Sequence, residues 1–212
     1  MSFRADFVKP PRVANWLVTL FVAGEEAESL QGDMLEEYSQ LASQSGVGFA
    51  RSWYWRQTRK TIAHLVGTTF RTAPWLTTAT VIAGFLLDRL VSGLPEQAIF
   101  AALNRYQAFE HHFSAYVFFA TYGIAIGHVI ASMFVGCAVA LASKGREMVA
   151  TMTLSIVFCA MTGAAVLVLL ATGKGLHLWM LPWNSADWLA IMIGGTIVRM
   201  RRSTVTNLLS SI

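Results

Sequence analysis

The stretch MVATMTLSIVFCAMTGAAVLVLLA, from Met148 to Ala171, decides the fold of this chain. It contains no charged residue, and a helix needs about 20 apolar residues to cross the hydrocarbon core of a bilayer. In the whole chain of 212 residues, 55% are hydrophobic and 13% are charged, whereas a soluble domain carries about 25% charged residues. This high hydrophobicity also excludes intrinsic disorder. The composition therefore predicts an all-α integral membrane protein.

Outward from this segment, other apolar runs follow the same pattern. We predict further spans at 74–91, 113–142 and 186–198, of which the last is short. The segment 113–142 is long enough to tilt or to project beyond the bilayer. Apolar residues at helical spacing predict an amphipathic helix over 95–112 along the outer membrane face. The expected architecture is a transmembrane domain of four helices, residues 72–212, behind a small helical domain, residues 1–71.

The distribution of lysine and arginine predicts the orientation. With four spans, both chain ends lie on one side, which carries thirteen of the sixteen cations: Arg4, Lys9, Arg12, Arg51, Arg56, Arg59, Lys60, Arg71, Lys144, Arg146, Arg199, Arg201 and Arg202. The remaining three are Arg89, Arg105 and Lys174. Because cation-rich loops stay in the cytoplasm, we expect both termini there, and the net charge of +4 indicates orientation rather than nucleic-acid binding.

The first 71 residues predict three helices: one that ends at Ala23, one over 25–45 and one that begins near Val47. Gly46 ends the second of these. We expect their large apolar side chains to form a core, namely Trp16, Leu30, Met34, Tyr38 and Trp53.

The third helix combines cations with aromatic rings. The residues concerned are Trp53, Tyr54, Trp55, Arg56, Gln57, Arg59 and Lys60. At a membrane interface, cations meet lipid phosphates while rings sit at headgroup level. We therefore expect this face to lie at the membrane interface or to dock a partner.

Small residues spaced four apart predict close helix contacts within the membrane. They are Gly123, Gly127, Ala131, Ser132, Gly136 and Ala140 in one span, and Ala160 and Ala164 in the next. Such residues let helix backbones approach where lipid offers no hydrophobic drive. The spacing does not separate a contact within one chain from a homo-oligomer.

One ionisable residue, His128, lies near the middle of the predicted span 113–142. At that depth it indicates a proton relay, a metal or haem ligand, or a polar substrate contact. The alternative, which we favour, is a neutral histidine hydrogen-bonded to a neighbouring helix.

Two polar groups lie at the outer ends of the predicted spans. Glu110, His111 and His112 offer ligands for a divalent ion, but adjacent helical residues point about 100° apart, which favours a hydrated interfacial patch. Asp88 and Arg89 fit a gate or ion path, although snorkelling to the interface is the simpler interpretation. The sequence has no phosphate loop, nucleophile elbow, HExxH or CxxC motif. We expect no enzyme activity, metal or cofactor.

Three N-terminal motifs follow one another: Pro10-Pro11-Arg12, Gly32-Asp33-Met34-Leu35-Glu36-Glu37-Tyr38 and Trp53-Tyr54-Trp55-Arg56-Gln57. This order resembles the permease prefix domain, a helical module ahead of bacterial ABC-type permeases of the macrolide-exporter and lipoprotein-release kind. The resemblance covers residues 10–65 and implies a bacterial inner-membrane protein with a cytoplasmic prefix. The permease body has no counterpart in these 212 residues, so the resemblance does not imply transport activity.

The leading hypothesis from sequence is a non-catalytic inner-membrane accessory or scaffold subunit that docks to a larger membrane complex. One alternative is a small homo-oligomeric transporter or channel with His128 and Asp88 on its path. Another is a membrane-bound sensor or regulator of transport. The expected partners are the lipid bilayer and other membrane-protein subunits, and not nucleic acid.

Overall fold

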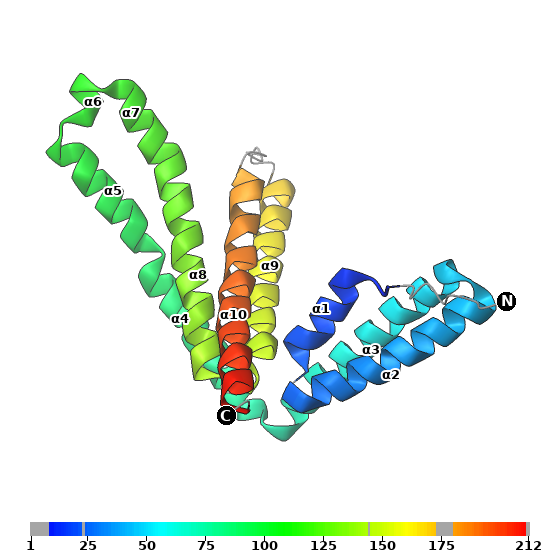
Figure 1. Cartoon of the computed structure of the whole chain (residues 1–212). Helices are drawn as coiled ribbons and strands as arrows, with labels where there is room; N and C mark the ends of the chain where they lie inside the picture. The colour runs from blue at the N-terminus through cyan, green and yellow to red at the C-terminus, as the bar shows by residue number, and fades with distance from the viewer. Residues whose placement is uncertain (1–8, 23, 144, 173–179, 211–212) are drawn as a thin grey trace. The chain divides into compact units, whose positions relative to one another are not determined.

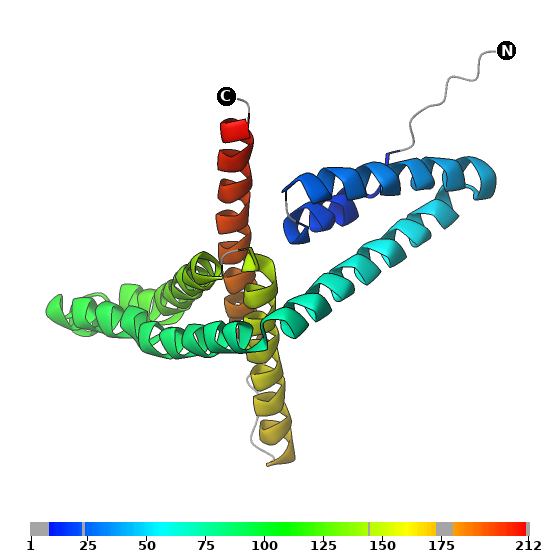
Figure 2. The ribbon, with the colours of Figure 1, turned by 90° about the horizontal axis from the view of Figure 1, so that it is seen from below.

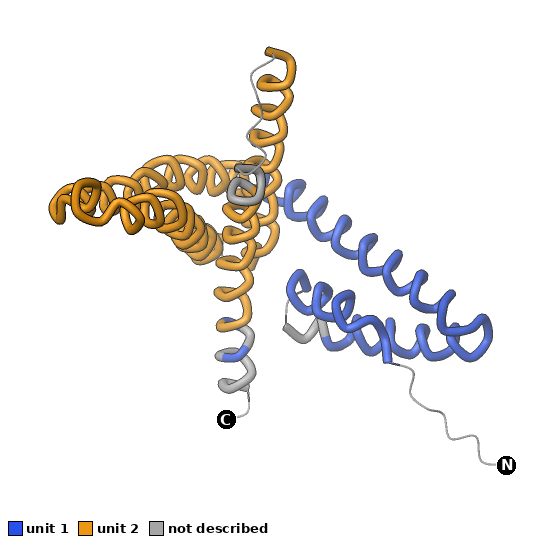
Figure 3. Tube along the Cα trace, turned by 90° about the horizontal axis from the view of Figure 1, so that it is seen from above, with its two compact units in different colours: residues 1–74, 202–212 blue, residues 75–201 orange. Residues whose placement is uncertain are grey.

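The computed structural model describes residues 9–22, 24–143, 145–172 and 180–210, apart from the side chains of 24–27, 180–184, 203 and 205–210. Every regular element of these residues is a helix, which confirms the all-α class for them (Figure 1). The chain divides into two compact units (Figure 3). We call Met1–Pro74 with Arg202–Ile212 the N-terminal unit and Trp75–Arg201 the membrane unit.

Three helices build the N-terminal unit: α1 (Arg12–Phe21), α2 (Gly24–Ser45) and α3 (Val47–Thr72). Gly46 joins the last two with a φ of 86°, in the left-handed region that glycine adopts without steric cost. Both α1 and α2 pack against α3. The observed α1 ends at Phe21. The predicted end of the first helix, residue 23, lies outside the described residues.

The N-terminal unit has its own hydrophobic core. Its buried members are Ala14, Val18, Val22, Met34, Tyr38, Ala50 and Tyr54. Leu30 and Trp53 pack against this core as predicted, but Trp16 is 45% exposed. The prediction for Trp16 is wrong because it stands two residues from both Ala14 and Val18, on the opposite face of α1.

The membrane unit is formed by the remaining elements in chain order, to which α10 contributes its residues up to Arg201. They are α4 (Pro74–Val91), α5 (Gly93–Arg105), α6 (Ala108–His111), α7 (Phe113–Phe118), the π-helical turn η1 (Phe119–Gly123), α8 (Ile124–Ala142), α9 (Glu147–Ala171) and α10 (Met180–Ser210).

Three helical stretches of the described chain are long and apolar enough to cross a membrane: Pro74–Arg105, Phe113–Ala142 and Glu147–Ala171. They are compatible with a multi-pass membrane protein. The helix α10 contains the predicted fourth span, 186–198, but is not among the three. Only one face of α10 is buried: Ala190 and Ile191 are 2% and 0% exposed, whereas Leu189 and Ile193 are 47% and 54% exposed.

The helix α5 follows α4 after a turn at Ser92 and then packs beside η1 and α8, as Figures 1 and 2 show. The single helix predicted over 95–112 is wrong. The chain leaves α5 at Arg105, passes through Gln107 with a φ of 49° and continues in the short α6.

Candidate functional site

Glycines bring the central helix α8 close to its neighbours α4 and α10. A Cβ atom added at Gly84 of α4 would lie 2.5 Å from Cγ2 of Val139. A Cβ atom at Gly136 of α8 would collide with the backbone carbonyl of Ile191 in α10. No side chain fits between α8 and α10 at Gly136, so these two helices approach backbone to backbone, whereas α4 packs its Gly84 against the Val139 side chain of α8.

The residues predicted for helix packing fall into two groups. Those of the span 113–142 face other helices: a Cβ at Gly123 would meet Ile99, a Cβ at Gly127 would meet Pro95, and the others are buried, namely Ala131, Ser132, Gly136 and Ala140. In contrast, Ala160 and Ala164 of α9 are exposed. The described part of the chain therefore leaves the small-residue stripe of α9 open.

Four polar side chains stand one or two helical turns from these glycine contacts. Asp88 follows Gly84 by four residues, Ser132 precedes Gly136 by four, and His128 precedes Ser132 by four. Asp187 likewise precedes Ile191 by four residues. Because helical residues four apart share a face, the contacts that join the helices also place these polar side chains opposite one another.

These four residues, Asp88, His128, Ser132 and Asp187, form what we call the polar cluster. Asp88 is 8% exposed and Ser132 is 4% exposed, and the Ser132 side chain lies within hydrogen-bonding reach of the Asp88 carboxylate. His128 lies within electrostatic range of both carboxylates, and Asp88 in turn acts on Asp187. Among the described residues, the buried Oδ1 of Asp187 has no hydrogen-bond partner.

The cluster changes the interpretation of two predicted residues. Snorkelling is the wrong interpretation for Asp88, because its side chain is buried toward α8. Its neighbour Arg89 is the exposed member of the pair, with its guanidinium 5.0 Å from the centre of the Phe85 ring. His128 lies within electrostatic range of two acidic groups from other helices, and the prediction of a neutral histidine hydrogen-bonded to a neighbouring helix stays a prediction.

Sequence reasoning missed Asp187 as a site residue and took Ser132 only as a packing residue. Asp187 can be noticed in the sequence as a carboxylate at the start of an apolar segment. The sequence does not show which residues of other helices lie near it. Those residues depend on which face α10 turns toward α8.

The cluster can take up a proton or a small cation. Asp88 and Asp187 contribute two negative charges when ionised, and Arg89 supplies one positive charge that acts on Asp88. The two ionised carboxylates together with Arg89 leave one net negative charge. An uncompensated charge in a low-dielectric interior is costly, so a proton or cation that balances it binds favourably.

The other predicted polar residues of the membrane unit do not join this cluster. His111 and His112 are both exposed. Among the described residues, no group of three His, Cys, Asp or Glu side chains is arranged to hold a metal ion.

The predicted docking face of α3 is only partly on the surface. Trp55, Arg56, Arg59 and Lys60 are exposed, and Trp53 and Gln57 are half-buried. Tyr54 does not belong to this face, because it is 0% exposed and packs in the core. It shares the inner face of α3 with Ala50 and Thr58, which lie one turn away on either side.

The motif on α2 divides in the same way. Gly32, Asp33, Glu36 and Glu37 are exposed, whereas Tyr38 is 0% exposed. The acidic surface of α2 is thus available to solvent or to a partner.

No protein-family model, no curated protein and no solved structure matches this chain. The predictions for Arg4, Lys144 and Lys174 lie outside the described residues.

Proposed function

We propose that this chain is a small transporter or channel for protons or small cations, with the polar cluster on its path. The observation that carries the proposal is that Asp88, His128 and Asp187, from three helices of an apolar unit, lie within electrostatic range of one another. Ionisable side chains inside a membrane are costly and mark ion paths and proton relays.

The proposed setting is a bacterial inner membrane with both termini in the cytoplasm. The cation distribution along the sequence and the resemblance of residues 10–65 to the permease prefix domain support this location. The proposed assembly is a homo-oligomer, supported by the open stripe of Ala160 and Ala164 on α9, which allows another helix to approach closely.

Purified protein in liposomes tests the proposal. An imposed pH or potassium gradient should drive ions across the liposome membrane. A pH-sensitive dye inside the vesicles records the resulting proton flux. Asp88→Asn and Asp187→Asn should each slow this flux by about tenfold, equivalent to about 1.4 kcal/mol of barrier. His128→Leu should also slow the flux, because it removes the polar side chain that lies within electrostatic range of both carboxylates.

Glu96→Gln is the matched control, because it removes one carboxylate from an exposed position of α5. It should leave the flux unchanged. Inert liposomes with correctly folded protein would remove the proposal, as would equal losses in Glu96→Gln and Asp88→Asn.

A second candidate function is a non-catalytic accessory subunit of a larger membrane complex. The exposed basic and aromatic residues of α3, Trp55, Arg56, Arg59 and Lys60, favour it. Gentle detergent extraction should then show the chain migrating with other membrane proteins. Arg56→Ala with Arg59→Ala should release them, while Arg12→Ala on the exposed part of α1 should not. A chain that migrates alone would contradict this function.

A further inference from the structure

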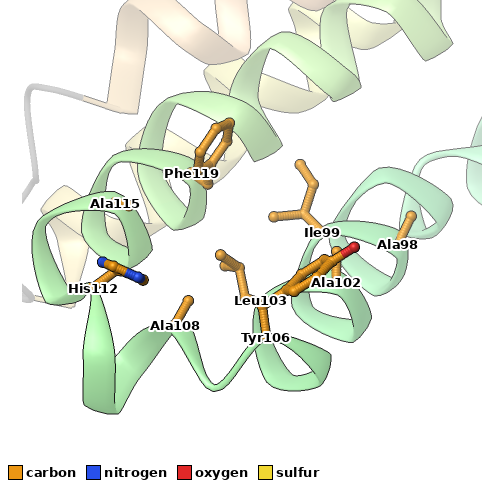
Figure 4. A pocket seen from close by; sticks show the side chains of 9 residues that line it. All are labelled: Ala98, Ile99, Ala102, Leu103, Tyr106, Ala108, His112, Ala115 and Phe119. Carbon is orange, nitrogen blue, oxygen red and sulfur yellow. The ribbon is translucent and has the colours of Figure 1, made fainter.

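A pocket lies in a different part of the membrane unit from the polar cluster. It is an open pocket lined by residues of the segment 93–123, which holds α5, α6, α7 and η1 and which we call the outer hairpin. Its volume is about 470 Å³, within the range of small-molecule sites. Figure 4 shows Ile99, Leu103 and Phe119 around a common space, with Tyr106 and His112 at its sides.

The sequence closes one end of the outer hairpin and opens the other. At the closed end, a Cβ at Gly127 would lie 2.5 Å from Cβ of Pro95, and one at Gly123 would lie 3.3 Å from Cδ1 of Ile99. Beyond these contacts, small side chains leave room for the pocket between α5 and the helical segment that begins at Phe113. They are Ala98, Ala102, Ala108 and Ala115.

The π-helical turn η1 lies between α7 and α8 and keeps one face of this continuous segment turned toward α5. In an unbroken α-helix, the twelve residues from Ala115 to Gly127 would rotate these positions about 120° apart. The wider turn at Phe119–Gly123 takes up part of that rotation. Consequently, Gly123, Gly127 and the pocket-lining Phe119 all lie on the side that faces α5.

Helix lengths place the pocket at the edge of the bilayer. The stretches Pro74–Arg105 and Phe113–Ala142 have 32 and 30 residues, or about 48 and 45 Å, against about 30 Å of hydrocarbon core. About 20 residues, counted from Pro74 or backward from Ala142, reach the base of the outer hairpin. The residues of each stretch that exceed this length of about 20 belong to the outer hairpin.

The polar residues of the outer hairpin agree with this position. Its exposed polar and charged side chains include Glu96, Asn104, Arg105, Gln107 and Glu110. Such side chains are costly in hydrocarbon but are solvated among lipid headgroups. The outer hairpin therefore carries an apolar pocket at the level where lipid chains meet water.

We propose that this pocket holds one acyl chain of a phospholipid from the adjoining leaflet. An apolar chain needs no hydrogen bonds from the lining, whose polar groups are only Tyr106 and His112. A peptide would bring unpaired backbone groups against the same apolar wall, at a desolvation cost. The lipid headgroup would stay in water beside the polar tip of the outer hairpin.

Photo-crosslinking tests the proposal on the full chain in phospholipid nanodiscs. The probe is a phosphatidylcholine with a diazirine on one acyl chain, and mass spectrometry locates the labelled peptides. Labelling should concentrate on 98–119 relative to the exposed apolar face of α9. A parallel sample receives a diazirine fatty acid without a headgroup.

Adjacent alanines of α5 supply a matched pair of variants. Ala102 lines the pocket and its neighbour Ala101 does not, although both are exposed. Ala102→Leu should lower labelling of 98–119 by about tenfold, and Ala101→Leu should not change it. Ala115→Leu fills the pocket from the other arm and serves if Ala102→Leu does not fold.

Enriched labelling that both filling variants remove supports the proposal. Even labelling over all lipid-facing helices, or labelling that survives both filling variants, overturns it. Enrichment with the free fatty acid alone also overturns it and identifies a fatty-acid site. Because the readout is labelling rather than flux, the outcome is independent of the proposed transport function.

Discussion

At the scale of single residues, the Tyr54 hydroxyl joins two helices of the N-terminal unit. It donates a hydrogen bond of 2.9 Å to Oδ1 of Asn15, and the ring is fully buried. Tyr54→Phe should destabilise this unit by about 1 kcal/mol, the usual contribution of one hydrogen bond. Hydrogen exchange in the full chain should show faster exchange in α1 and unchanged exchange in α9; slow exchange in both would contradict this prediction.

Burial also raises the pKa of the Tyr54 phenol above its ordinary value of 10.0. A raised folded-state pKa means that the neutral phenol contributes its stability fully below pH 10.0, and that this contribution is lost as the pH rises through the folded value. Tyr54→Phe should therefore remove this alkaline loss, which unfolding of both proteins above pH 10.0 would reveal.

The carboxylate of Glu147 is another buried polar group with specific partners. It is 2% exposed, lies 3.6 Å from Nη1 of Arg199 and accepts a hydrogen bond of 3.1 Å from the Gly145 amide. Its place in the first turn of α9 also suits a negative charge.

Arg199→Met should lower the stability of the membrane unit by about 1–3 kcal/mol, because it removes a charged partner from a buried carboxylate. The thermal midpoint in detergent measures the effect. Arg201→Met is the matched control at an exposed position of the same helix, and it should be neutral. Adding Glu147→Gln to Arg199→Met should restore part of the loss; no restoration would show that the pair is not coupled.

At the scale of helices, two glycines predict opposite outcomes for the same substitution. A Cβ at Gly136 would collide with the Ile191 backbone, whereas no atom lies within 4 Å of one at Gly163. Gly136→Ala should separate α8 from α10 and cost about 1–3 kcal/mol, typical of overpacking. Gly163→Ala should be neutral or stabilising. Thermal midpoints of both variants in one detergent decide; a neutral Gly136→Ala would contradict the contact.

Helices could be predicted from the sequence because length and apolar content are local properties. The break at Tyr106–Gln107 could not, since neither glycine nor proline marks it. The same limit applies to the polar cluster. His128 and Asp88 stand out as charges in apolar segments, but their meeting with Asp187 depends on the register of α4, α8 and α10. Gly84, Gly136 and Gly194 set that register, and spacing alone does not name their partners.

At the scale of the whole molecule, the two units differ in how many of their large apolar side chains are buried. The N-terminal unit encloses its own core around Tyr38 and Tyr54, with charged side chains outside. The membrane unit instead leaves large apolar side chains exposed, as for Leu167 at 67% and Phe134 at 65%. Exposure on that scale is unfavourable in water but suits contact with lipid. The exposed apolar side chains of the membrane unit are therefore compatible with a bilayer, whereas the N-terminal unit buries its own core.

This division, together with the proposed four spans, predicts which residues a membrane-impermeant maleimide can reach in intact cells. In a background with Cys137→Ala and Cys159→Ala, Glu110→Cys on the outer hairpin should react at once, because it is exposed and the proposed topology puts it outside the cytoplasm. Asp33→Cys and Thr204→Cys should react only after the membrane is permeabilised, because an even number of crossings returns the chain to its starting side. Reaction of Thr204→Cys but not Asp33→Cys in intact cells would mean that α10 does not cross, and would leave the three apolar stretches as the only spans among the described residues.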